Sequence, residues 1–200
     1  MAYKDFTLER LETEFGIKNQ KAKLFENIKA VEPSSWLLET LAYGQDLPIR
    51  SEKSRSELIV TPILVEIIRR NLNVVTFYSG ERLDADKKHG LIGECDFLIT
   101  KDTGSYSINS PLLAIVEAKK HDVDLGINQC SAQLYGAKIF NEIRNTPIKT
   151  LYGCVTTGSD WLFLKLEGNL VTIDSQKHKQ EDLPMLLGIL QTIIDFYKEQ

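Results

Sequence analysis

Two short apolar runs that carry acidic residues constrain this chain more than any other feature. They cover residues 93–100 and 112–120, are rich in β-branched and aromatic residues, and are bounded by Gly, Asp, Asn, Ser or Pro. Such runs favour β-strands, and the turn-forming residues between them predict a hairpin. Because carboxylates are rarely buried without a partner, the acids inside these strands are expected to have a compensating positive group nearby.

The alternation of side chains along the two strands brings a pair of carboxylates together. We expect the hairpin to be symmetric about Tyr106 and Ser107. Its antiparallel register then places Asp96 opposite Glu117, with Lys119 on the same strand face as Glu117. Facing acids repel, so the pair indicates a cation between them. Oxygen ligands on adjacent strands suit Mg²⁺, and the lysine amine can position or activate a water molecule.

At these residues the sequence resembles the PD-(D/E)XK restriction-endonuclease-like nuclease superfamily, especially the nuclease domain of type I restriction enzyme R subunits and related stand-alone proteins. Asp96 matches the family aspartate and residues 117–119 match its Glu-x-Lys motif, although Cys95 replaces the usual preceding proline. The resemblance implies a Mg²⁺ ion, replaceable by Mn²⁺, held by Asp96, Glu117 and the backbone carbonyl of Ala118. It also implies that Lys119 acts on the attacking water.

Glu57, on a helix predicted over residues 51–70, has two compatible interpretations. Related nucleases carry a glutamate on the helix before the core strands, which makes Glu57 a candidate catalytic residue and metal ligand. Alternatively, Glu57 closes a capping box with Ser54 at the start of the helix.

Four more positions complete the candidate site. Gln129 and Gln133 lie four residues apart on a helix predicted over 127–143, hence on one face. Related nucleases often carry Gln-xxx-Tyr on this helix, but here the tyrosine is Tyr135. We assign Gln129 to the catalytic group, and Gln133, Lys120 and Thr157 to substrate binding. Thr157 begins a turn that related nucleases place over the active face.

The order of predicted elements indicates the fold class. Helices are expected as two short segments within 5–30 and at 36–41, 51–70, 127–143 and 183–197, and strands at 73–79, 93–100, 112–120, 151–156, 161–166 and 169–173. This order predicts an α/β fold with a mixed central β-sheet flanked by helices, which is also the core order of the restriction-endonuclease-like fold. We divide the chain into an N-terminal helical extension, 1–50, and a nuclease domain, 51–200.

Composition limits the other function classes. The formal net charge of −4 argues against a broadly basic, non-specific nucleic-acid binder, but acids clustered at a metal site are compatible with a nuclease. The 3 cysteines lack zinc-ligand spacing and a disulfide framework, so we expect buried thiols. No apolar leader or membrane span is evident, and a reducing cytoplasm is the expected compartment.

The sequence therefore predicts Mg²⁺-dependent hydrolysis of DNA in restriction, defence or repair, and the resemblance implies 5′-phosphate ends. Because the chain lacks a P-loop pattern, any translocase must be a separate chain. A specificity subunit and a homodimer stay open as partners. One alternative is a catalytically silent nucleic-acid-binding or interaction subunit with the same fold. Another is a structural protein whose hairpin and last helix form a dimer interface.

Overall fold

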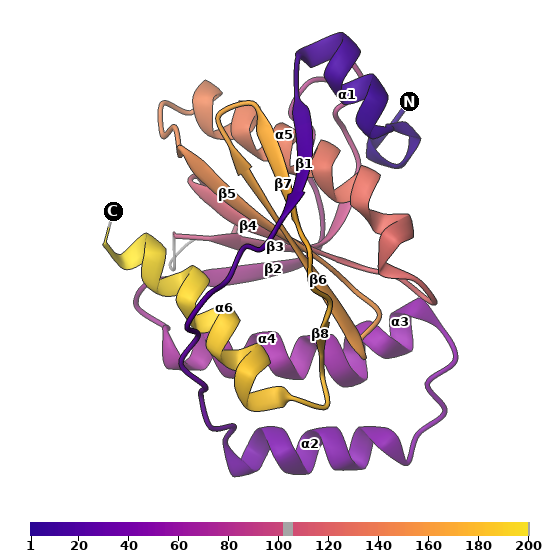
Figure 1. The fold of residues 1–200 in the computed structure, drawn as a ribbon, viewed down its shortest axis with the longest axis vertical. Coiled ribbons are helices and arrows are strands. Elements are labelled where there is room, and N and C mark those ends of the chain that lie inside the picture. Colours follow the sequence, from indigo (N-terminus) through magenta and orange to yellow (C-terminus); the bar gives the residue numbers. More distant parts are fainter. Residues whose placement is uncertain (102–105, 200) are drawn as a thin grey trace.

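A mixed β-sheet between two helical layers forms the centre of the molecule in the computed structural model, which describes residues 1–101 and 106–199 (Figure 1). The strand order is β1 (Lys18–Ala22), β7 (Leu170–Asp174), β6 (Asp160–Glu167), β5 (Thr150–Thr156), β4 (Leu112–Ala118), β3 (Glu94–Thr100) and β2 (Thr76–Arg82), with β8 (His178–Lys179) paired to β6. The β1–β7 and β4–β5 pairs are parallel, and the other pairs are antiparallel. The predicted fold class is confirmed.

Helices cover both faces of the sheet. The helices are η1 (Tyr3–Asp5), α1 (Leu8–Phe15), α2 (Ser35–Gln45), α3 (Glu52–Arg55), the π-helical turn η2 (Ser56–Val60), α4 (Thr61–Arg70), η3 (Val123–Gly126), α5 (Ile127–Ile143) and α6 (Leu183–Lys198). One buried core joins the sheet to α4 and α6, with α2 outside α4 (Figure 1). A second core joins the opposite face to η1, α1 and α5. Among the described helices, none is long and apolar enough to cross a membrane.

The central hairpin has the predicted register. Leu98 pairs with Ile115 and Phe97 with Val116, so the next positions outward are Asp96 and Glu117. The ladder shifts between Ile99 and Thr100, and residues 102–105 of the connecting loop lie outside the described residues. Helix α5 connects β4 to β5, and these two strands are parallel as a crossover requires.

The N-terminal region differs from the prediction. Gly16, with a φ of 68°, ends α1 in a left-handed conformation. The second helix expected within 5–30 is wrong, because Lys18–Ala22 forms the edge strand β1 and pairs with β7. Its side chains are mostly exposed, so the segment lacks the alternating pattern that identifies a half-buried strand. The region assigned as a helical extension thus contributes a strand to the sheet.

The start of one helix and the bounds of one strand also differ from the prediction. The capping box lies at Ser51 and Ser54, whose side chains bond each other's backbone amides, so the box expected between Ser54 and Glu57 is wrong. The helix therefore begins one turn earlier than that box implied. Strand β2 covers Thr76–Arg82, so it begins and ends later than the strand predicted over 73–79.

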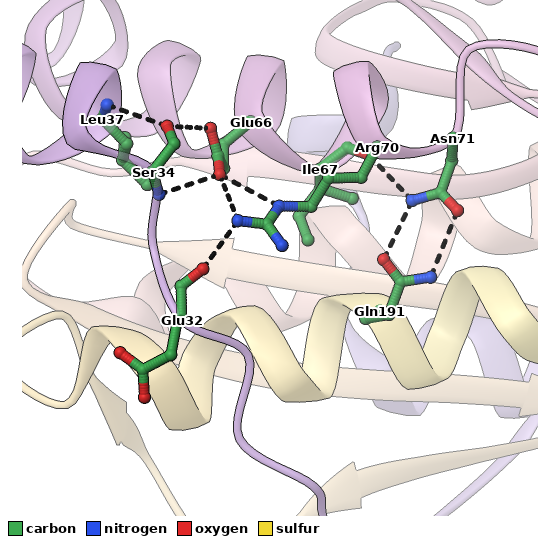
Figure 2. A network of polar contacts seen from close by, with 8 residues as sticks. All are labelled: Glu32, Ser34, Leu37, Glu66, Ile67, Arg70, Asn71 and Gln191. Atoms are coloured by element: carbon green, nitrogen blue, oxygen red, sulfur yellow. Dashed lines mark hydrogen bonds and ion pairs between the residues drawn. The ribbon is translucent and has the colours of Figure 1, made fainter.

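A polar network attaches the chain before α2 to the long helix α4 (Figure 2). Glu66 is only 3% exposed, and it accepts hydrogen bonds from Ser34 N at 3.1 Å, Ser34 Oγ at 2.7 Å and Arg70 Nε at 2.9 Å. Asn71 and Gln191 exchange amide hydrogen bonds of 2.9 and 3.1 Å, which join α4 to α6. Burial raises the pKa of Glu66, but the bonds from Ser34 and Arg70 outweigh it and hold the pKa below its ordinary value.

We expect Glu66→Gln to lower the free energy of unfolding by about 2 kcal/mol near neutral pH, because buried donors lose a charged acceptor. A lowered pKa stabilises the fold above the ordinary glutamate pKa of about 4.3, so the deficit should shrink as pH falls below it. Urea unfolding between pH 3 and 7 measures this effect. The exposed Glu39→Gln is the control, and an equal deficit in both variants would contradict the assignment.

Candidate active site

The predicted acidic pair lies where β3, β4 and α5 meet. Glu117, at the end of β4, is 3% exposed. Its Oε1 accepts a hydrogen bond from Lys119 Nζ at 2.7 Å and another from Gln129 Nε2, and its Oε2 accepts one from Gln133 Nε2 at 2.8 Å. Lys119 Nζ also donates to Gln129 Oε1 at 3.2 Å. The structure thus brings Glu117, Lys119, Gln129 and Gln133 into one hydrogen-bonded group.

Glycine allows α5 to approach this group closely. A side chain at Gly126, just before α5, would overlap Val155 on β5, and its Cβ would also lie 3.2 Å from Lys119 Cγ. The first turns of α5 therefore pack directly against the strand ends. This packing directs the amides of Gln129 and Gln133, which lie one helical turn apart, toward Glu117.

Asp96 reaches across from β3 to the neighbouring strand. Its Oδ2 accepts a hydrogen bond of 2.6 Å from the backbone N–H of Ala118, the residue after Glu117. Burial raises the pKa of Asp96, and the charges of Glu52 and Glu94 raise it further. The Ala118 bond and the charge of Lys119 oppose this rise without cancelling it.

The pKa of Glu117 is raised further than the pKa of Asp96. Burial, followed by the charge of Asp96, raises the pKa of Glu117 to about 7, despite the opposing charge and hydrogen bond of Lys119. Burial lowers the pKa of Lys119, but the charge and bond of Glu117 outweigh it and raise the pKa above its usual value. Lys119 is therefore a protonated hydrogen-bond donor at neutral pH, next to two acids whose ionised forms repel each other.

Glu52 is the carboxylate that the sequence analysis missed. Its charge raises the pKa of both Asp96 and Lys119, and it lines a cavity of about 470 Å³ together with Asp96, Glu94 and Glu57. Glu57 lines the same cavity but is 60% exposed, and its nearest cationic partner is Lys53 at 3.8 Å. The helix before the core strands thus supplies two acids to this cavity, and only Glu52 is electrostatically linked to both Asp96 and Lys119.

A π-helical turn, η2, lies between α3 and α4. Glu52 and Lys53, just before this turn, both line the cavity and are both exposed, with the Lys53 side chain at 83%. Glu52 therefore acts on the acidic pair through its charge at the cavity rim rather than through burial. Helical periodicity with a constant 3.6-residue repeat cannot anticipate the change of register at a π-turn.

Two of the predicted substrate contacts need correction. Gln133 is fully buried beneath Glu117, so its amide contacts that carboxylate and has no access to a substrate. Thr157 is also buried, and its Oγ1 accepts a hydrogen bond of 3.1 Å from Asp160 N inside the β5–β6 turn. Lys120 is exposed just beyond β4 and remains a candidate for substrate binding. Tyr135 packs against Phe15, with ring centroids 5.0 Å apart, away from the acidic pair.

The donor set fits a hard, hydrated cation. The Asp96 and Glu117 carboxylates, with the Ala118 carbonyl, offer oxygen ligands from adjacent strands, and burial, the main cause of the raised pKa values of both acids, is a cost that a bound cation would offset. Gln133 Oε1 is also buried with no hydrogen-bond partner. Within the described residues, no three acidic, histidine or cysteine side chains converge as a complete ligand set. Mg²⁺ commonly uses one or two carboxylates and retains several waters, so a pair is sufficient.

Comparison with known proteins does not assign the chain to a family. No protein-family model matches the sequence, and no curated protein is significantly similar to it. The geometry of Asp96, Glu117, Lys119 and their neighbours is therefore the basis on which a function can be proposed.

We expect the pH dependence of stability to report the buried acid. Because the folded-state pKa of Glu117 is raised to about 7, the metal-free fold holds a proton that the unfolded chain releases at lower pH. Stability should therefore fall as pH rises from about 5 to 8, by up to about 3 kcal/mol from this group. Glu117→Gln should be close to wild type at pH 5 and more stable at pH 8. Urea unfolding in EDTA measures the difference, and a pH-independent difference would contradict it.

Proposed function

We propose that this protein is a Mg²⁺-dependent nuclease that hydrolyses phosphodiester bonds in DNA. The observation that carries the proposal is the pair formed by the half-buried Asp96 and the buried Glu117 on adjacent strands, with the Lys119 ammonium hydrogen-bonded to Glu117. Two acids with raised pKa values beside a protonated lysine are expensive to maintain unless a cation and an anionic substrate complete the site.

The residues have distinct roles in this proposal. Asp96, Glu117 and the Ala118 carbonyl hold the metal. A bound Mg²⁺ ion, which Mn²⁺ can replace, supplies charge stabilisation at the phosphoryl and leaving oxygens. Lys119 is protonated, so it orients the attacking water and an anionic oxygen by donating hydrogen bonds.

Two further groups support this arrangement. Gln129 fixes both Lys119 and Glu117, because its Oε1 accepts from Lys119 and its Nε2 donates to Glu117. Glu52 adds negative charge at the cavity side of the pair, where it strengthens the attraction for a cation. Both groups act on the acidic pair without forming part of the covalent step.

The proposal includes a cellular role and compartment. A restriction, defence or repair role in the cytoplasm agrees with three buried, free cysteines, which need no oxidising compartment. Translocation or target recognition would come from a separate subunit. The alternative of a catalytically silent nucleic-acid-binding or interaction subunit is less favoured, because replacing Glu117 by an uncharged residue would relieve the cost of its burial.

A cleavage assay tests the proposed activity. With Mg²⁺ and plasmid or duplex DNA, Asp96→Asn and Lys119→Met should each lower the cleavage rate by at least about 100-fold, because each removes charge that acts on the transition state. Asp46→Asn and Lys21→Met, which alter exposed residues away from the site, are the matched controls. Equal cleavage by all five proteins, including wild type, would refute the enzyme assignment.

The same assay ranks the two helix acids. Because Glu52 interacts with both Asp96 and Lys119, Glu52→Gln should slow cleavage about tenfold more than Glu57→Gln. The two substitutions change the charge equally on one helix, so each is a control for the other. A larger loss in Glu57→Gln would reverse the assignment.

A further inference from the structure

Arg55 provides a cationic group beside the candidate site that has no carboxylate partner among the described residues. It lies on α3, one helical turn after Glu52, and its Nη1 donates a hydrogen bond of 3.3 Å to the backbone carbonyl of Thr157. Its Nε atom is buried and has no hydrogen-bond partner. Glu57, which lies close along the same helix, pairs instead with Lys53.

An unpaired donor of this kind is costly. A buried N–H without an acceptor costs about 1–3 kcal/mol, and a guanidinium increases the cost because it is charged. An arginine held by one backbone carbonyl, with its remaining donors uncommitted, is therefore suited to an anion that arrives from outside.

The position of Arg55 relative to the acidic pair defines where such an anion would lie. The Thr156 carbonyl accepts the Lys119 N–H at 2.7 Å, and the next carbonyl, that of Thr157, accepts Arg55. The guanidinium of Arg55 therefore lies beside the end of β5. Lys119 follows the neighbouring strand β4, and Asp96 lies on β3, the next strand in the sheet.

The guanidinium is also on the opposite side of the pair from the acidic cavity. That cavity is lined by β2, β3, Glu52 and Lys53 of α3, and Glu57 of η2, whereas Arg55 donates to the β5–β6 turn. Ile59 packs on Gly158 of this turn, where a Cβ would lie 3.1 Å from Ile59 Cδ1, so the helix and the turn hold Arg55 in place. Neighbouring strands are about 4.8 Å apart, so β5, whose end Arg55 contacts, and β3, which carries Asp96, are separated by two strand spacings.

We propose that Arg55 binds the DNA phosphate adjacent to the scissile phosphate, on the β5 side of the acidic pair. This inference rests on the proposed nuclease function and adds a substrate-binding residue that the sequence motif does not contain. The planar guanidinium donates paired hydrogen bonds to two phosphate oxygens, which a lysine in the same place cannot reproduce.

The test measures DNA affinity without cleavage. Binding of a labelled duplex oligonucleotide is titrated in Ca²⁺, a hard cation that takes the same oxygen ligands, at several salt concentrations. Arg55→Gln should weaken binding about tenfold or more and reduce the slope of log affinity against log salt by about one, the effect of losing one phosphate contact. Arg55→Lys should keep the slope but bind more weakly than wild type.

Controls separate this role from its alternatives. Arg144→Gln removes an exposed guanidinium at the far end of α5 and should leave affinity and slope unchanged. If Arg55→Gln lowers the urea midpoint and affinity but keeps the wild-type slope, Arg55 only fastens the Thr157 turn and the inference is overturned. If wild type does not bind DNA at all, the proposed function itself fails. If wild type binds DNA and Arg55→Gln binds with the same affinity and salt slope, only the role of Arg55 is refuted.

Discussion

The burial of the Glu117 carboxylate opposite Asp96 is the constraint on which the rest of the site depends. A carboxylate that is 3% exposed and faces a second acid must be compensated, and the fold provides Lys119, Gln129 and Gln133 around it. This compensation is incomplete, since the pKa of Glu117 remains raised to about 7. The remaining electrostatic cost is the basis of our proposal that a cation completes the site.

The surrounding elements each contribute to that geometry. The antiparallel β3–β4 pair sets the two acids side by side, and the parallel β4–β5 crossover brings the start of α5 over Glu117. Glu52 on α3 lines the cavity beside Asp96, and Arg55 connects the same helix to the β5–β6 turn. The network of Glu66 with Ser34 and Arg70 then anchors the other end of this long helix (Figure 2). Helix α3–α4 thus connects the site to the N-terminal region.

Local patterns predicted much of this structure, and their failures have physical causes. The hairpin, its register, the bounds of α5 and the buried cysteines follow from alternation, helical periodicity and composition. Strand β1 escaped prediction because an exposed edge strand is specified by its partner β7 rather than by its own side chains. Glu52 escaped it because its role depends on the position of α3 beside β3, which no local pattern specifies. The burial of Gln133 depends on how closely α5 packs on the sheet, which spacing alone does not specify.

Calorimetric titration with Mg²⁺ is the most direct test of the central claim that a divalent cation completes the Asp96 and Glu117 pair. At pH 8 the account predicts a saturable binding heat for wild type, with both Asp96→Asn and Glu117→Gln showing at least about tenfold weaker binding because each removes a charged ligand. Exposed-site Asp46→Asn should bind as wild type does. Absence of binding heat in wild type, or equal binding by all four proteins, would contradict the account.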